Sequence, residues 1–340
     1  MEPVMKQFLK FAVVLACILG TQHFESLAGT VTFGNGANAF SMEFVAIGNP
    51  GNAPQFQGTS DEVGTVGYTF DIGKFEVNRD MIEKYNAASE NAALQITMSD
   101  LSSNGGNGAN KPATGVSWNE AARFINWLNT STGGTAAYNF ISSGVDDNIE
   151  IWTASDTLDY DPANPFRSKR AKYALPHMDE IHKAAYYNPV GGVYYNYATG
   201  SNSTPIAVSS GTAQFTAVYN QLLSQGPAEV DNAGALSPYG VMALNGNVRE
   251  WEESPNTRDN YNGNSLRAYQ SGGWSDSSVG IRNTANPKNG FGSGGFRVVM
   301  LTPSNGGGGE VPEPSTFVIG SLFGLGAYFS KKRRKTRVSQ

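Results

Sequence analysis

Residues 237–252 read S-P-Y-G-V-M-A-L-N-G-N-V-R-E-W-E, and they carry more structural information than any other part of the chain. Apolar side chains alternate there with Gly240, Gly246, Asn245 and Asn247, so backbone carbonyls can turn outward between buried residues. Hard cations such as Ca²⁺ bind such carbonyls together with Asn and Glu oxygens. The stretch is therefore predicted to be a core segment that holds a metal ion, and not a catalytic segment.

The composition favours a loop-rich globule of the extracellular type. Of the 340 residues, 40 are Gly, and only 16% are charged. Six Lys and Arg side chains lie in the last ten positions, and without them the formal charge changes from −5 to about −11. An acidic body of this kind repels nucleic acid, so we expect no nucleic-acid partner.

Cysteine and histidine are scarce. Cys17 is the only cysteine and falls within an apparent export signal, so the mature domain can form no intramolecular disulfide, zinc finger or cysteine nucleophile. His177 and His182 lie about 140° apart on a helix, so they do not share a face as a metal-binding pair would. We expect them in surface or cap positions. The chain has no G-x-S-x-G, H-E-x-x-H or P-loop motif, and no catalytic residue is assigned.

Both ends of the chain resemble targeting signals. Residues 1–28 have a basic start, an apolar run at 11–20 and the small residues Ser26 and Ala28 before a predicted cleavage point. A buried N-terminal helix and a lipoprotein signal ending at Cys17 are the alternatives. Residues 29–303 then form one domain, and 304–310 form a glycine-rich linker.

Residues 311–340 contain V-P-E-P-S, an apolar segment at 316–329 and a cationic tail. This order resembles the PEP-CTERM sorting signal of Gram-negative bacteria, whereas an ordinary single-pass tail is the alternative. At about 1.5 Å per residue the apolar segment spans roughly 21 Å, which is short for a permanent bilayer crossing. We therefore expect an exported protein of the periplasm, cell envelope or exterior, transiently anchored and processed by an exosortase-type protease.

The domain itself predicts a mixture of strands and short helices. Strands are expected within 29–52 and as a pair within 63–77, and Asn78 is expected to cap a short helix. Ser117 and Glu120 form an S-x-x-E capping box for a core helix that ends near 129. Another helix is predicted at 177–187. Residues 130–172 read as a solvated polar insertion, although Asp159 and Asp161 could instead hold a cation.

Several segments resemble, in order, the formylglycine-generating enzyme or sulfatase-modifying factor family. The resemblance implies an α+β fold, a variant of the C-type lectin fold, that is loop-rich with few short helices and antiparallel strands. The matching segments are F-E-V-N at 75–78, P-A-T-G-V-S-W-N-E-A at 112–121, L-P-H-M-D-E-I-H-K-A-A at 175–185, G-N-V-R-E-W at 246–251, G-G-W at 272–274 and G-F-R at 295–297.

The resemblance also implies which chemistry this chain has lost. Active members of the family use two cysteines to bind copper and oxidise a substrate cysteine, but residues 274–282 and onward contain none. Cu(I) prefers sulfur ligands, so no copper is expected. A structural Ca²⁺ is implied, held by Asn245, Gly246, Val248 and Glu250, although a turn whose asparagines bond to nearby backbone is equally compatible. Arg282 and Arg297 are expected to pair with acidic residues.

The sequence leaves two hypotheses for function. The first is an exported, non-oxidase binding or structural surface module, whose partner is an extracellular polysaccharide or another surface protein. The second is a divergent metal-dependent oxidase that resembles the formylglycine-generating or non-haem-iron enzymes. The candidate binding cavity is formed by Trp274, Ser275, Asp276, Ser277 and Arg282.

Overall fold

The computed structural model describes residues 29–57, 61–89, 91–255, 260–280 and 282–303. The predicted export signal, the linker at 304–310 and the sorting segment at 311–340 lie outside these residues. Among the helices that are described, none has the length and apolarity needed to cross a membrane.

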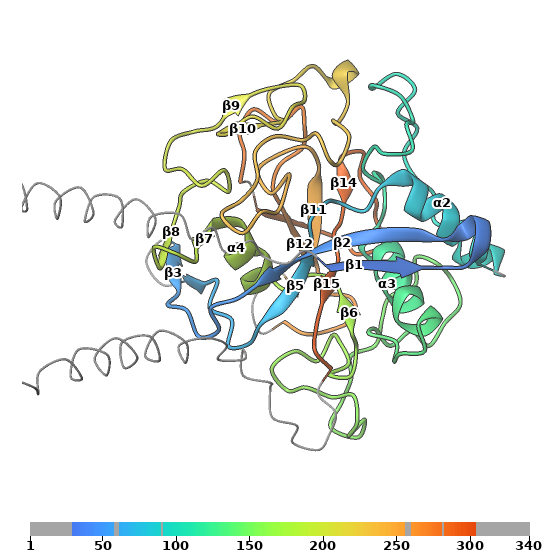
Figure 1. Ribbon diagram of the computed structural model, residues 1–340. Helices are drawn as coiled ribbons and strands as arrows, with labels where there is room; N and C mark the ends of the chain where they lie inside the picture. Colours follow the sequence, from blue (N-terminus) through green and yellow to red (C-terminus); the bar gives the residue numbers. More distant parts are fainter. Residues whose placement is uncertain (1–28, 58–60, 90, 256–259, 281, 304–340) are drawn as a thin grey trace, which may run out of the picture. The chain divides into compact units, whose positions relative to one another are not determined.

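A five-stranded antiparallel sheet joins the two ends of the domain (Figure 1). Along β2, Phe40, Met42 and Phe44 are buried while Ser41 and Glu43 are exposed, which is the alternation of a strand with one covered face. The strands predicted within 29–52 are thus confirmed. The sheet runs in the order β1 (Gly29–Phe33), β2 (Phe40–Ile47), β5 (Phe70–Gly73), β15 (Val299–Met300) and β6 (Tyr173–Ala174).

A second sheet contains the G-N-V-R-E-W region. Its strands are ordered β13 (Asn283–Ala285), β12 (Arg267–Gln270), β11 (Arg249–Pro255) and β14 (Gly294–Gly295). β11 pairs antiparallel with β12 and parallel with β14, and all its residues after Arg249 are buried. The carboxylates of β11 therefore need partners inside the protein.

In the part of the chain that the structure describes, the loops also contain three two-stranded pairs and three 3₁₀ helices. The strand pair predicted within 63–77 is wrong, because β5 pairs with β2 and β15, and β4 pairs with the preceding β3. The remaining elements are β3 (Gln55–Gln57), β4 (Asp61–Val63), β7 (Tyr187–Asn188), β8 (Val193–Tyr194), β9 (Ile206–Ala207), β10 (Thr216–Ala217), η1 (Gly36–Asn38), η2 (Ala92–Leu94) and η3 (Leu223–Gln225).

The three α-helices among the described residues begin at the predicted caps. In α2 (Arg79–Ala88), Asn78 accepts a hydrogen bond from the Met81 amide. α3 (Trp118–Ser131) has the complete Ser117–Glu120 capping box. α4 (Met178–Tyr186) begins at His177, which confirms the cap position of this histidine. His182 is buried and its Nε2 lies 2.7 Å from the Gln55 Oε1, so its expected surface position is wrong.

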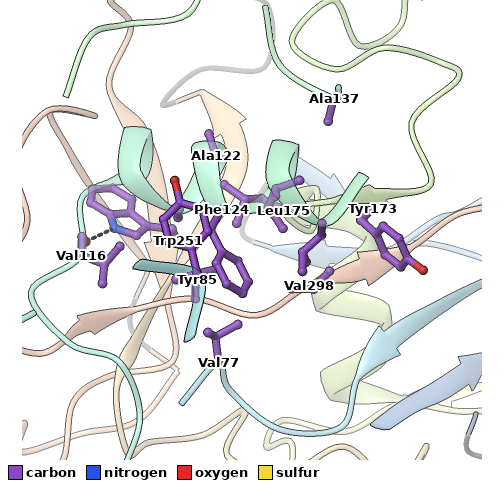
Figure 2. Packing of buried hydrophobic residues seen from close by; sticks show 14 of the residues in the cluster. Val77, Tyr85, Val116, Ala122, Phe124, Ala137, Tyr173, Leu175, Trp251 and Val298 are labelled. Atoms are coloured by element: carbon purple, nitrogen blue, oxygen red, sulfur yellow. Dashed lines mark hydrogen bonds between the residues drawn. The ribbon is translucent and has the colours of Figure 1, made fainter. Parts of the chain in front are cut away.

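An aromatic core joins both sheets to α3 (Figure 2). Trp251 of β11 donates from its indole Nε1 to the Val116 carbonyl at 2.9 Å, and Phe124 of α3 packs edge-on against Tyr85 of α2. Trp118, Phe124 and Trp251 are fully buried. Burial of these large rings fixes where β11 runs relative to α3.

The segment at 130–172 is part of this core. Tyr138 and Phe166 are buried, so the expected solvated insertion is wrong. Asp159 lies 2.9 Å from Arg170 and pairs with that guanidinium. The segment therefore combines exposed turns with buried aromatic residues and ion pairs.

Candidate functional site

The G-N-V-R-E-W segment begins with a tightly folded turn. Gly246 has φ +144°, and a Cβ at this position would lie 2.4 Å from the Val218 carbonyl oxygen. Ala243 and Asn247 also have positive φ values, which L-residues adopt only when their surroundings hold them there. The Asn247 side chain accepts from the Ala228 amide at 2.8 Å and donates to Glu76 at 2.6 Å. The turn is therefore fixed by neighbours from three other segments.

Glu250 forms a buried ion pair with Arg297. The Arg297 Nε and Nη2 atoms lie 2.5 Å and 2.6 Å from the two carboxylate oxygens, and both side chains are fully buried. Arg297 also donates to the carbonyls of Gly73 and Met242, each at 2.9 Å. One guanidinium thus ties β11 to β5 and to the turn before it, and the prediction that Arg297 pairs with an acidic residue is confirmed.

A second buried carboxylate, Glu76, lies beside this pair. Burial raises its pKa well above the ordinary value, and the nearby Glu250 carboxylate raises it further, whereas Arg297 and the Asn247 amide act in the opposite direction. The Glu76 Oε1 atom is buried without a hydrogen-bond partner. Glu76 also borders a cavity of about 210 Å³. At neutral pH the cluster holds two carboxyl groups and one guanidinium, which favours a proton on Glu76.

Three of the four residues implied for calcium have other hydrogen-bond partners. The Asn245 Oδ1 accepts from the Ala198 amide at 2.5 Å, while both oxygens of Glu250 are bonded to Arg297. The Gly246 carbonyl accepts from the Ser271 hydroxyl at 3.3 Å. Nor do the described residues contain a group of three or more His, Cys, Asp or Glu side chains placed to hold a metal. As arranged, these residues do not fit Ca²⁺ bound through Glu250, because Ca²⁺ and the guanidinium would compete for one carboxylate.

The residues of the predicted binding cavity are divided between core, loop and ion pairs. Trp274 is 2% exposed, and its indole Nε1 donates to the Leu223 carbonyl at 3.2 Å. Asp276 forms a two-pronged bond with Arg249 at 2.9 Å and 2.5 Å, which fastens the loop to β11. Ser275 and Ser277 are exposed. Trp274 therefore packs in the core, whereas Ser275, Ser277 and Arg282 are open to solvent.

Arg282 points to another part of β11. Its Nη2 lies 3.1 Å from the Glu252 carboxylate, which is fully buried. The prediction that Arg282 pairs with an acidic residue is confirmed. Its guanidinium and the Asp276 carboxylate therefore have different partners.

Sequence reasoning missed an aromatic groove that is partly lined by α3. The groove is a cavity of about 420 Å³ between α2, α3 and the segment that follows α3. The sequence did contain a pattern that indicates a shared helix face. The i, i+3, i+4, i+7 spacing of such a face is found at Arg123, Asn126, Trp127 and Thr130. The aromatic-rich face of that helix was instead interpreted as core. Other groove residues are Tyr85, Tyr138, Asn139, Phe140 and Trp152.

The fold defines a class: a loop-rich α+β domain with short helices and curled sheets, tied together by buried ion pairs. The family model for the sulfatase-modifying factor enzyme 1-like domain matches residues 27–301, so the chain belongs to this family. Its fold is the sulfatase-modifying-factor variant of the C-type lectin fold. No curated protein matches the chain.

Solved structures show the same fold at low sequence identity. The structure titled CarF has a TM-score of 0.54 at 20% identity and covers 77% of this chain and 98% of its own. The Treponema denticola variable protein 1 has a TM-score of 0.53 at 18% identity and covers 80% of this chain and 98% of its own. At such identities the likeness concerns the fold alone.

Proposed function

We propose that this protein is an exported, envelope-sorted binding or structural module that has kept the sulfatase-modifying-factor scaffold and lost its oxidase chemistry. The observation that carries the proposal is the absence of cysteine from residues 29–303, since Cys17 is the only cysteine. Copper oxidation of a cysteine substrate needs the thiolate pair of the active family members, and serine or aspartate oxygens are poor ligands for Cu(I).

The polar residues of the family segments support the same conclusion. Glu250, Glu252 and Asp276 each bind an arginine, so their charges hold strands and loops together. Of these pairs, Glu250–Arg297 is fully buried on both sides and is therefore costly to break. A rigid, loop-rich surface of this kind suits recognition of an extracellular polysaccharide or another surface protein.

The two histidines that could serve as metal ligands in a divergent oxidase both form structural hydrogen bonds. His177 Nδ1 accepts from the Asp179 amide at 3.3 Å as a helix cap, and His182 is held near Gln55. Burial lowers the pKa of His182 to about 4. Because the two histidines have separate structural roles, we favour the binding module over the oxidase.

An assay for oxidase activity tests this proposal directly. The purified chain with added copper would be incubated with a C-x-P-x-R peptide, and oxygen consumption and aldehyde formation would be followed. We expect neither above background, with an active family member as the positive control. Turnover above background would overturn the proposal. Metal analysis of the same preparation adds a second test, because stoichiometric iron or copper would favour the oxidase.

The proposal for localisation concerns the two ends of the chain. We expect residues 1–28 to direct export and 311–340 to act as a sorting signal removed by an exosortase-type protease. Mass spectrometry of the protein from fractionated cells should find a mature N-terminus at Gly29 and no peptide from the cationic tail. Recovery of the intact chain from the cytoplasm would contradict this assignment.

A further inference from the structure

Hydrogen bonds made by the lining residues fix the positions of the aromatic rings in the groove. The Asn126 amide donates to the Tyr138 carbonyl at 2.7 Å and accepts from the Tyr138 amide at 2.8 Å. The Trp152 indole donates to the Ala137 carbonyl at 2.9 Å. Trp127 stacks edge-on with Tyr85 at a ring separation of 5.6 Å. The rings are thus positioned before any ligand arrives, which lowers the entropy cost of binding.

Arg123 gives the groove a positive charge that no carboxylate neutralises directly. Its guanidinium lies 3.8 Å from the centre of the Phe140 ring. Its Nε and Nη2 donate to the carbonyls of Val145 and Ser142, while Nη1 has no partner in the part of the chain that is described. The residue is 8% exposed and forms no ion pair with a described acidic residue.

Nearby acidic groups act on Arg123 only from a distance. Burial lowers the pKa of Arg123, and Tyr85, Asp147 and Asp146 partly oppose that shift. Asp147 accepts from the Gly144 amide, and Asp146 accepts from the Ser117 hydroxyl. A largely buried cation with an unused donor is the arrangement that a bound carboxylate would complete.

We propose that this groove binds a pyranose saccharide that carries a carboxylate, such as a uronic acid unit of an acidic polysaccharide. A pyranose has apolar C–H faces and polar edges, which match aromatic rings beside a few hydrogen-bonding groups. Trp127 and Trp152 supply the rings, Arg123 binds the carboxylate, and Asn139 is the nearby amide for a hydroxyl. The volume of about 420 Å³ is within the range of small-molecule sites.

This inference rests on the proposed binding function and names its ligand class. The test is a titration of the full chain, followed by tryptophan fluorescence, with oligogalacturonate and with an uncharged glucose oligomer of the same length. We expect saturable binding of the acidic oligomer, at least tenfold weaker binding of the neutral one, and weakening of the former by salt. Equal affinity for the two oligomers, or no saturable binding of the acidic one, would overturn the inference.

Two groove variants and one control assign the effect to this site. Arg123→Gln should reduce affinity for the acidic oligomer at least tenfold and abolish the preference over the neutral one. Trp152→Ala should weaken binding of both oligomers by a similar factor. Phe56→Ala, at a ring that is 65% exposed on β3, is the matched control and should change nothing. Unchanged affinity in Arg123→Gln would overturn the inference even if Trp152→Ala fails to fold.

The outcome also separates this inference from the proposed function. If both groove variants still bind whole acidic polysaccharide as the unaltered chain does, the module binds elsewhere and the groove assignment fails alone. Oxidase turnover in the peptide assay, in contrast, would overturn the proposed function whatever the groove binds.

Discussion

Charges are arranged in opposite ways along β11 and in the aromatic groove. The guanidinium of Arg297 satisfies Glu250 and two backbone carbonyls, and each of its three nitrogens donates at least one hydrogen bond. Arg123, which is 8% exposed, is bonded to two backbone carbonyls and has one nitrogen without a hydrogen bond among the described residues. The charges of the family-like segment hold strands together, whereas the proposed recognition site lies where a buried charge is incompletely paired.

The largest expected effect comes from breaking the pair along β11. Arg297→Met leaves Glu250 buried without a cation and two carbonyls without a donor, so we expect a loss of about 3–5 kcal/mol in the free energy of unfolding. The measurement is urea unfolding followed by circular dichroism. Lys288→Met, at an exposed cation, is the control and should change stability by less than about 0.5 kcal/mol.

A double variant distinguishes pairing from calcium binding. Glu250→Gln combined with Arg297→Met removes both charges, so it should be less destabilised than Arg297→Met alone. If Ca²⁺ were bound through Glu250, EDTA would lower the Tm of the unaltered chain and have no effect on Glu250→Gln. We expect no such difference, because the Glu250 oxygens are bonded to Arg297.

The next effect concerns Glu76 and depends on pH. Burial raises the pKa of Glu76, so between the ordinary value of 4.5 and the raised value the folded protein keeps a proton that the unfolded chain has released. The stability from this group is complete below about pH 4.5 and is lost as the pH rises toward the folded-state pKa.

Glu76→Gln removes this titration and should flatten the dependence of stability on pH. Urea midpoints at about pH 5 and pH 8 are the measurement, and the difference between them should shrink in the variant. Glu83→Gln, at an exposed position of α2, should leave the difference as it is. An unchanged difference in Glu76→Gln would mean that Glu76 is ionised in the folded protein.

The family, the fold class and the helix starts could be predicted because they depend on local signals. Ser117 and Glu120 lie three residues apart and meet in any helix that begins there. The sequence analysis predicted that Arg282 and Arg297 pair with acidic residues. It did not name the partners, and the partner of Arg297 is 47 residues away. Glu250 was assigned to calcium by the family resemblance. The sequence alone does not show whether a carboxylate binds a metal ion or a guanidinium.

The features that were missed depend on contacts between distant segments. β4 pairs with β3 instead of continuing toward β5, and nothing in the three residues 61–63 specifies this choice. The groove is formed by residues from α2, from α3 and from the segment between α3 and Trp152. The polar residues of that segment led to the prediction that it is solvated. Its Tyr138 is buried because Asn126, on the helix before it, binds its backbone.

The smallest effect tests the loop that was predicted to line a cavity. Asp276→Asn removes the charge that Arg249 binds, but the Asn oxygen can still accept from the Gly273 amide, as Asp276 does at 2.6 Å. Because Arg249 is partly exposed, we expect a loss of only about 1 kcal/mol in the free energy of unfolding. Saccharide binding should remain unchanged in this variant, because Asp276 does not line the groove. A loss of binding with little loss of stability would show that the loop at 274–280, and not the groove, recognises the saccharide. The roles assigned to the two regions would then be exchanged.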